Sequence, residues 1–256
     1  MIISASGSHD FAESVRSLSA DDPFACRVIA QYGCYRPGLS FVDYWLTADD
    51  GGNVSGAISR NGSNYVLFLT EKSDIGEISS FLRMSGFSSV LCDGGYSLEL
   101  DACESSGAIM KTAKKLAVNK SESIIEPTIR EAYDLIAKCA EEGFMPPPFE
   151  DFYVDVNHKL RHNAMRLIGV RDGEALAAVA MSIAETGDLA VLGAAACHPA
   201  FRGKGYGSYI IAQITNSLIN EGKTVYLYRA LSKNVRFFNK LGFIECGTWK
   251  EYVNNG

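Results

Sequence analysis

The stretch Cys197-His198-Pro199-Ala200-Phe201-Arg202-Gly203-Lys204-Gly205-Tyr206-Gly207-Ser208 separates an apolar segment, 189–197, from an amphipathic one, 208–221. Its glycines alternate with larger residues, and glycine tolerates positive φ, so successive backbone N–H groups can turn toward one point. A helix that starts here adds its positive N-terminal end, and Arg202 and Lys204 add formal charge. The stretch therefore predicts an anion-binding loop suited to a diphosphate.

Two other interpretations of this loop are weaker. A turn that only reverses the chain needs neither three glycines nor two cations. A dinucleotide-binding fold would carry GxGxxG, and Gly203-Lys204-Gly205 followed by Ser208 is one residue short of that motif. The next predicted strand also ends at Tyr228-Arg229 instead of the acidic residue that holds a ribose, and too little chain follows for a doubly wound sheet.

Periodicity on both sides of the loop predicts the elements of the C-terminal half. Thr128 and Glu131 form a capping-box pattern that opens a helix. The predicted helices span 128–142, 149–162, 208–221 and 234–241, and the predicted strands span 164–170, 175–183, 189–197 and 224–228, with the last strands within 243–253. Because a helix connects 189–197 to 224–228, we expect these two strands to lie parallel.

The N-terminal half shows a similar mixture without recognisable chemistry. It predicts helices over 11–32 and 74–84, a hairpin turn at Asn61-Gly62, and strands over 41–46, 54–58, 65–69 and 89–92. The polar segment 118–127 ends in proline and is interpreted as a linker. The fold class is therefore α+β (mixed α/β), with domains over 1–122 and 123–256.

Composition excludes several function classes. The chain has 256 residues, of which 47% are hydrophobic and 21% charged, a balance typical of a globular protein. No segment approaches the roughly 20 apolar residues that span a bilayer, and the first residues do not resemble a signal peptide. The net charge of -6 argues against nucleic-acid binding. Seven scattered cysteines without a CxxC pair indicate buried thiols in a reducing cytoplasm.

Arg202-Gly203-Lys204-Gly205-Tyr206-Gly207 matches the (Arg/Gln)-x-x-Gly-x-(Gly/Ala) signature of the GNAT acyltransferase superfamily. A second stretch agrees, because Asn234 and Phe237-Phe238-Asn239-Lys240-Leu241-Gly242-Phe243 resemble the family's late helix and its Lys-Leu-Gly-Phe-type turn. The resemblance covers about 128–253 and is strongest to the FR47-like branch. It implies a central mixed sheet flanked by helices, in which the fourth strand splays from the fifth.

The resemblance also implies a reaction and its site. An acyl group would move from acetyl-CoA to an amine of a small molecule or peptide, by direct attack in a ternary complex, without a metal. The implied contacts are the backbone of Ala195, Ala196 and Cys197 with the pantetheine arm, the amides from Arg202 through Ser208 with the diphosphate, and Asn234, Phe237 and Phe238 with the thioester end. The acceptor would enter from the opposite side.

The sequence departs from the family where a proton must move. Family members often have a tyrosine as general acid at the position of Phe238, which cannot donate a proton. Tyr226 and Tyr228 are the weak candidates to replace it, although a packed aromatic role suits both. No carboxylate lies within 189–197, where a glutamate often serves as base. These departures favour, as the alternative function, a catalytically silent module that senses CoA or acyl-CoA.

Three further features receive structural interpretations. His158 and His162 have a spacing that can bind metal, but HKLRH is not HExxH, and a solvated helix face explains them better. Cys197 would offer its backbone instead of a nucleophilic thiol. The N-terminal half faintly resembles a degenerate half-copy of the same fold without the glycine loop. We expect it to bind no CoA, and either to cover the acceptor site or to mediate a homodimer.

Overall fold

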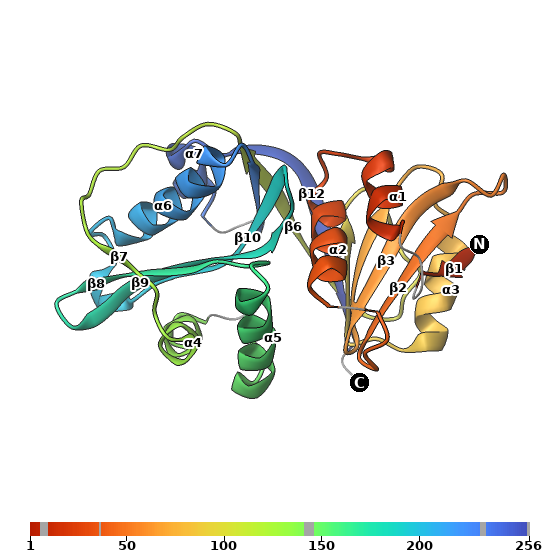
Figure 1. Ribbon diagram of the computed structural model, residues 1–256, viewed down its shortest axis with the longest axis horizontal. Coiled ribbons are helices and arrows are strands. Elements are labelled where there is room, and N and C mark those ends of the chain that lie inside the picture. Colours follow the sequence, from red (N-terminus) through yellow and green to blue (C-terminus); the bar gives the residue numbers. More distant parts are fainter. Residues whose placement is uncertain (6–9, 36, 141–145, 231–233, 255–256) are drawn as a thin grey trace. The chain divides into compact units, whose positions relative to one another are not determined.

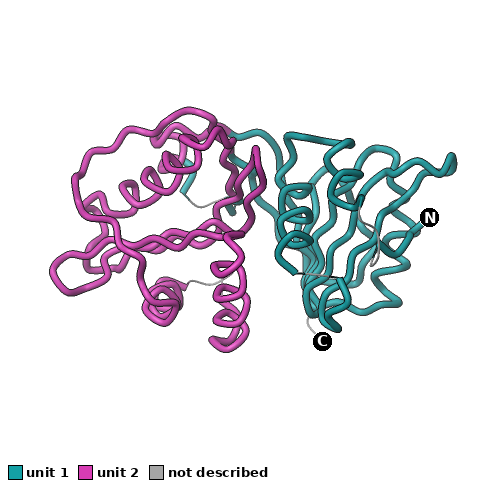
Figure 2. Tube along the Cα trace, in the orientation of Figure 1, with its two compact units in different colours: residues 1–110, 228–235, 245–256 teal, residues 111–227, 236–244 magenta. Residues whose placement is uncertain are grey.

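The computed structural model describes residues 1–5, 10–35, 37–140, 146–230 and 234–254. These residues form two compact units, shown in Figure 2. Unit 1 comprises 1–110, 228–235 and 245–256, and unit 2 comprises 111–227 and 236–244. Each unit is a mixed β-sheet with helices on both faces (Figure 1), which confirms the predicted fold class.

Unit 1 has a sheet in the order β1-β2-β3-β4-β5-β12-β6. Helices α1 and α2 pack on one face of it, and α3 packs on the other (Figure 1). Its strands are β1 (Ile2–Ser4), β2 (Val42–Ala48), β3 (Val54–Asn61), β4 (Asn64–Leu69), β5 (Ser89–Asp93), β6 (Cys103–Thr112) and β12 (Ile244–Val253), and its helices are α1 (Phe11–Leu18), α2 (Pro23–Cys34) and α3 (Ile75–Ser85).

Unit 2 has a sheet in the order β11-β10-β9-β8-β7. Helix α6 covers one face, and α4 and α5 cover the other (Figure 1). Its strands are β7 (Ile124–Ile125), β8 (Leu167–Asp172), β9 (Ala175–Glu185), β10 (Leu189–Cys197) and β11 (Thr224–Ala230), and its helices are α4 (Ile129–Lys138), α5 (Phe149–Arg161), the 3-10 turn η1 (Pro199–Phe201), α6 (Tyr206–Asn220) and α7 (Val235–Leu241).

The same element order occurs in both units. The run β1-α1-α2-β2-β3-β4-α3-β5 and the run β7-α4-α5-β8-β9-β10-α6-β11 both read β-α-α-β-β-β-α-β. In each unit the last two strands of the run are parallel and joined by a helix. The N-terminal half therefore repeats the topology of the C-terminal half. Its sequence lacks the glycine-rich loop found at 202–207.

The limits of the two units differ from the predicted domains 1–122 and 123–256. The final strand β12 pairs with β5 from Trp249↔Asp93 to Val253↔Ser89, so the end of the chain belongs to the sheet of unit 1. Residues 111–122 belong to unit 2. Within the predicted linker 118–127, β7 pairs with β8 through Ile124↔Val170 and Ile125↔Gly169. Contacts far apart in sequence decide these limits, and composition alone does not reveal them.

Local sequence explains most helix boundaries. The predicted helix over 11–32 is two helices, because Pro23 occupies the first position of α2 and the Asp22 side chain accepts from the N–H groups of Phe24 and Ala25. The capping box of Thr128 and Glu131 is present at α4. Helix α4 ends at Lys138, before the predicted end at 142, and residues 141–145 lie outside the described residues.

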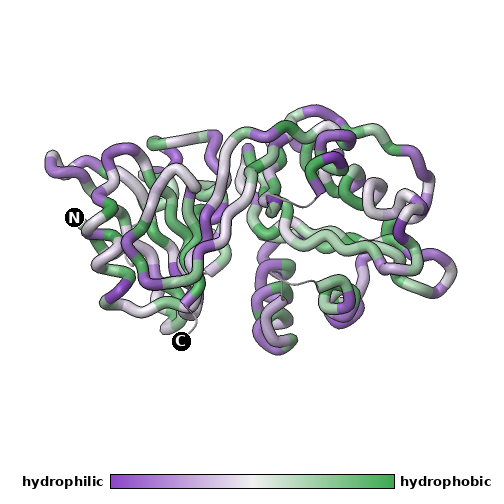
Figure 3. Tube along the Cα trace, turned by 180° about the vertical axis from the view of Figure 1, so that it is seen from behind, coloured by the Kyte–Doolittle hydropathy of each residue, from purple (hydrophilic) through white to green (hydrophobic). Residues whose placement is uncertain are grey.

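Hydrophobic side chains hold each sheet to its helices. In unit 2, Ala132, Leu135 and Ile136 of α4 pack with Val179 and Met181 of β9. On the other face, α6 buries an apolar stripe that includes Ile210, Ile214 and Leu218. Figure 3 shows hydrophobic residues along the strands and more hydrophilic ones toward the loops. Among the described helices, none combines the length and the apolar character needed to cross a bilayer.

Candidate functional site

The parallel pairing of β10 and β11 stops halfway along β10. The register runs from Leu189↔Thr224 to Leu192↔Leu227. Among the described residues, 193–197 of β10 do not pair with β11. They remain paired with β9, for example through Ala195↔Ala180 and Cys197↔Ala178. One edge of β10 therefore keeps its backbone groups available where the two parallel strands separate.

A bulge accompanies this separation. The register between β10 and β9 shifts on both sides of Leu192, which is typical of a strand that bends. Gly193 is required just after it, because a Cβ there would lie 2.1 Å from Cγ2 of Ile183 on β9. Gly193 and Ala195 are both exposed, although they lie in an interior strand of the sheet. The run of small residues thus opens a surface beside the free edge of β10.

The glycine-rich loop follows directly. Gly203 and Gly205 have φ of +78° and +87°, a region that L-residues with side chains rarely occupy. Gly205 is the N-cap of α6, and α6 has no side-chain cap. The first described hydrogen bond of the helix backbone is from Tyr209 N–H to the Gly205 carbonyl. No side chain therefore occupies the N-terminus of α6, and of its first-turn amides the N–H of Gly207 points to the Cys197 thiol.

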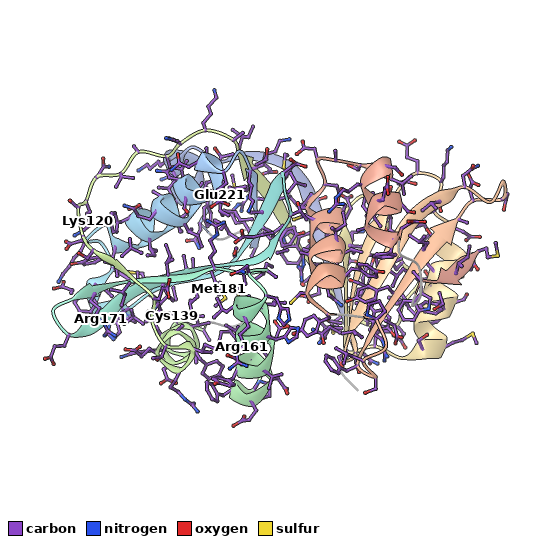
Figure 4. All side chains as sticks on the ribbon, in the orientation of Figure 1. Lys120, Cys139, Arg161, Arg171, Met181 and Glu221 are labelled. Atoms are coloured by element: carbon purple, nitrogen blue, oxygen red, sulfur yellow. The ribbon has the colours of Figure 1, made fainter. Side chains whose placement is uncertain are left out.

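Three cations surround this loop. Arg202 is exposed, and its Nε donates to the Cys197 carbonyl at 3.4 Å. Lys204 Nζ lies 3.6 Å from Asp172 Oδ2. Lys120, labelled in Figure 4, has its Nζ 4.0 Å from the centre of the Tyr206 ring and its Cε within 3.7 Å of a Cβ built on Gly205. Sequence reasoning missed Lys120 because it lies about 85 residues before the loop, in the segment interpreted as a linker.

The end of β10 is fixed by polar contacts. The Cys139 thiol donates to the Cys197 carbonyl at 3.3 Å, and His198 Nδ1 accepts from Ala200 N–H at 3.2 Å. His198 Nε2 lies 2.8 Å from Lys138 Nζ. Burial raises the pKa of the Cys197 thiol, and the N–H of Gly207 only partly opposes this. A protonated thiol is a poor nucleophile at neutral pH, which agrees with a backbone role for Cys197.

The remaining predicted site residues are not all brought to the loop. Tyr226 is buried in unit 2, with Lys111 Nζ 5.7 Å from its ring centre. Tyr228 belongs to unit 1, where it stacks on Phe24 at 5.6 Å. The role of either tyrosine as general acid stays a prediction.

The late helix α7 is short. Phe237 and Phe238 on α7 are half-buried, and Phe238 packs edge-on against the buried Phe243 at 6.0 Å. Asn234 is exposed with φ of +58° and belongs to unit 1, while the preceding residues 231–233 lie outside the described residues. The proposed contacts of these three residues with a thioester stay predictions.

The histidine pair has a local role. At the end of α5, the rings of His158 and His162 lie tilted to each other with centroids 4.2 Å apart, and His162 Nδ1 lies 2.8 Å from the His158 carbonyl. His162 is exposed at the helix C-terminus, where a histidine is favourable for the helix dipole. The interpretation of the pair as a solvated helix surface without a metal stays a prediction.

Comparison with known proteins adds family and fold. Residues 129–243 match the family described as Acetyltransferase (GNAT) family. Among curated proteins, none matches the sequence. A solved tandem GNAT protein from the clavulanic acid biosynthesis pathway is similar over 99% of this chain and 98% of its own, at 13% identity and a TM-score of 0.60.

Two other solved structures are similar along the whole chain. A GCN5-related N-acetyltransferase from Sphaerobacter thermophilus is 12% identical with a TM-score of 0.60, over 99% of this chain and 95% of its own. A GNAT-family acetyltransferase from Colwellia psychrerythraea is 14% identical with a TM-score of 0.55, over 99% of both chains. Such identities carry the fold alone, and the fold extends to both units. With its open strand edge, uncapped helix and glycine loop, the C-terminal region 129–243 is a domain of the acetyltransferase (GNAT) family.

Proposed function

We propose that unit 2 binds acetyl-CoA and transfers its acetyl group to the amine of a small molecule or peptide. The observation that carries the proposal is the open corner where β10 parts from β11 and leads into the uncapped N-terminus of α6. A general acyltransferase function follows from the family, and the donor, the acceptor and the chemistry are what we add here.

The residues of the corner fit such a donor. The amides of Tyr206 and Ser208 and the cations Arg202 and Lys204 supply donors and charge for a diphosphate, while the Gly207 N–H points to the Cys197 thiol. The free edge of β10 supplies N–H and carbonyl groups that can pair with the amides of a pantetheine arm, as an added strand would. Lys120 adds a further charge beside Gly205.

The reaction needs few protein groups. The nitrogen of a neutral amine attacks the thioester carbonyl, a C–N bond forms, the C–S bond breaks, and the sulfur leaves as a thiolate that takes up the proton. Holding the two reactants together supplies much of the rate, in ideal cases about 7–11 kcal/mol of the barrier. A backbone N–H of the separated part of β10 would stabilise the oxyanion. No side chain is assigned here as acid or base.

Thermal unfolding with acetyl-CoA tests the donor. At 100 times Kd, binding stabilises by about 2.7 kcal/mol, which corresponds to roughly 5–10 °C for a unit of this size. Gly207→Glu should abolish the shift, because a carboxylate would enter the diphosphate position, while the new Cβ would meet only Cys197 Cβ at 3.7 Å and leave the fold intact. Gly187→Glu is the matched control, since Gly187 lies in a turn with nothing within 4 Å of a Cβ. An equal shift in both variants would overturn the proposed donor site.

Release of free thiol with a panel of amines tests turnover. The alternative function, a silent sensor of CoA or acyl-CoA, is favoured by Phe238, which cannot donate a proton, and by the absence of a carboxylate from β10. An acyltransferase releases thiol only when an amine is present, and Gly207→Glu abolishes the release. Binding of acetyl-CoA without release for any amine would favour the sensor.

A further inference from the structure

Unit 1 contains a cavity of about 200 Å³ that the proposed function does not use. Arg27 of α2 forms one wall, and the facing wall consists of Leu91 on β5 and Trp249 and Glu251 on β12. Trp249 and Glu251 are two residues apart on one strand, so both point to the same face of the sheet. The cavity therefore lies between α2 and the sheet, entirely within unit 1.

The cavity holds two opposite charges that do not neutralise each other by contact. Arg27 and Glu251 are both half-buried, and neither forms an ion pair in the part of the chain that the structure describes. Burial raises the pKa of Glu251, and the positive charge of Arg27 opposes this rise. The two groups therefore interact electrostatically without direct contact. Unpaired charges in a partly buried place are costly unless a ligand or solvent satisfies them.

Tyr228 also lines the cavity. Its hydroxyl is buried away from the open space and interacts with Arg27, without a hydrogen bond of normal geometry among the described residues. Its ring stacks on Phe24 at 5.6 Å and lies under the Arg27 guanidinium, 5.6 Å from ring centre to Cζ. Trp249 is held next to it at 6.5 Å, with its Nε1–H donating to the Arg229 carbonyl at 3.3 Å. Aromatic rings thus form part of the cavity lining beside the two charged residues.

We propose that this cavity of unit 1 binds a small zwitterion of the α-amino acid class. The ligand carboxylate pairs with the fork of the Arg27 guanidinium, and the ligand ammonium pairs with Glu251. The rings of Tyr228 and Trp249, which line the cavity, pack against the ligand. The size agrees, because the volume lies below the roughly 300–1,000 Å³ of sites for larger molecules.

Intrinsic fluorescence gives a direct test, because the chain has only two tryptophans. Trp45 packs in the core of unit 1, stacked on Tyr65 and edge-on to Phe81, and Trp45→Phe keeps a ring there. Trp249 is then the sole reporter, inside the cavity. Titration of the full chain carrying Trp45→Phe with each common L-α-amino acid should give a saturable change for at least one of them. Trp249→Phe, which keeps Trp45, should give no such change.

Ligand derivatives and charge variants then identify the two contacts. The N-acetyl amino acid lacks the ammonium and the amino acid amide lacks the carboxylate, and each should bind about tenfold or more weakly than the parent. Arg27→Gln should remove the preference for the acid over the amide. Glu251→Gln should remove the preference for the free amine over the N-acetyl form. Each charge thus has its own ligand signature, which a general loss of folding would not produce.

Controls keep the proposal falsifiable. Arg16→Gln and Glu13→Gln change equivalent charges on the exposed face of α1 and should leave amino acid binding unchanged. The thermal shift with acetyl-CoA reports on unit 2 and should be retained in Arg27→Gln and Glu251→Gln. No saturable signal for any amino acid, checked by calorimetry, would overturn the proposal. Equal binding of parent, N-acetyl form and amide would overturn it as well.

Discussion

The two units contain the same strand–helix–strand corner with opposite electrostatics. In unit 1, β4 pairs with β5 only from Asn64↔Ser89 to Val66↔Leu91, so these strands also separate. There the N-terminus of the following helix α3 is capped, because the Asp74 side chain accepts a hydrogen bond from Glu77 N–H. In unit 2 the equivalent cap is Gly205, which has no side chain to offer. One residue type at the cap decides whether the helix end is already satisfied or open to an anion.

The charged residues beside the two corners also differ. In unit 1 a cavity of about 390 Å³ is lined by Asp22, Glu71 and Asp93, three carboxylates that would repel a diphosphate. In unit 2 the corner carries Arg202, Lys204 and Lys120, of which Lys204 pairs with Asp172 and Lys120 with Glu122. A shared topology therefore does not carry a shared ligand, and the site must be argued from its side chains. The expectation that unit 1 binds no CoA stays a prediction.

Transferring the cap of unit 1 to unit 2 should have the largest effect. Gly205→Asp places a carboxylate at the N-terminus of α6, where it would occupy the amides and repel a diphosphate, and acetyl-CoA affinity should fall about 100-fold or more. Gly205→Asn is the matched control, because both residues meet the same backbone strain at φ of +87° and Asn carries no charge. Calorimetry with acetyl-CoA measures the difference. Equal affinities of the two variants would mean that charge at this cap does not matter.

Removing the cation that only unit 2 brings to its corner should have a smaller effect. Lys120→Ala should weaken acetyl-CoA binding about threefold to tenfold and reduce its salt dependence, because one attractive charge beside Gly205 is lost. Lys115→Ala, an exposed lysine of the same segment, should leave both quantities unchanged. Titrations at two ionic strengths measure this. A similar loss in both variants would indicate a general charge effect.

Opening the cap of unit 1 should cost stability without creating a site. Asp74→Ala removes the hydrogen bond to Glu77 N–H and should lower the free energy of unfolding by about 1 kcal/mol. Acetyl-CoA affinity should not change, since the proposed donor site belongs to unit 2. Denaturant unfolding and calorimetry on the same variant measure both. An altered acetyl-CoA affinity would place part of the donor site in unit 1.

The helix caps of the two units should also respond oppositely to pH, with the smallest effect. A hydrogen bond from Arg171, with those from Thr128, lowers the pKa of Glu131 in unit 2 to about 2 from 4.5. Burial raises the pKa of Asp22 in unit 1 above 3.8, despite hydrogen bonds from Ala25 and Phe24 N–H. The Glu131 contribution is therefore complete above pH 4.5 and lost as the pH falls through 2, whereas Asp22 costs stability as the pH rises through its folded pKa.

Acid titrations of stability test these signs. Glu131→Gln should lose about 0.2–1 kcal/mol at pH 6, because the ion pair with Arg171 is partly exposed, and this difference from the parent should shrink toward pH 2. Asp22→Asn should show the opposite trend and come closer to the parent, or exceed it, as the pH rises. Parallel stability curves for parent and Glu131→Gln between pH 6 and 2 would contradict the assigned pKa.

Local signals predicted most of unit 2. Apolar periodicity predicted strand β10 at 189–197 and helix α6. The pair Asp172-Gly173 predicted the turn that connects β8 to β9. The helix between β10 and β11 implied parallel pairing, which is confirmed. The anion-binding loop could be predicted because three glycines and two cations close together are not needed for a simple turn. Lys120 could not be found in this way, since its place beside Gly205 results from contacts across the chain.

The sequence by itself determined the class of fold, the family of residues 129–243 and the loop that ends in Gly205, because glycine spacing, capping residues and periodicity act over a few neighbouring positions. Tertiary structure alone decided that β12 completes the sheet of unit 1, that β10 leaves β11 after Leu192, and that Arg27, Tyr228 and Glu251 line one cavity. These residues are distant in the chain, and strand pairing and packing bring them together through contacts that no local pattern encodes.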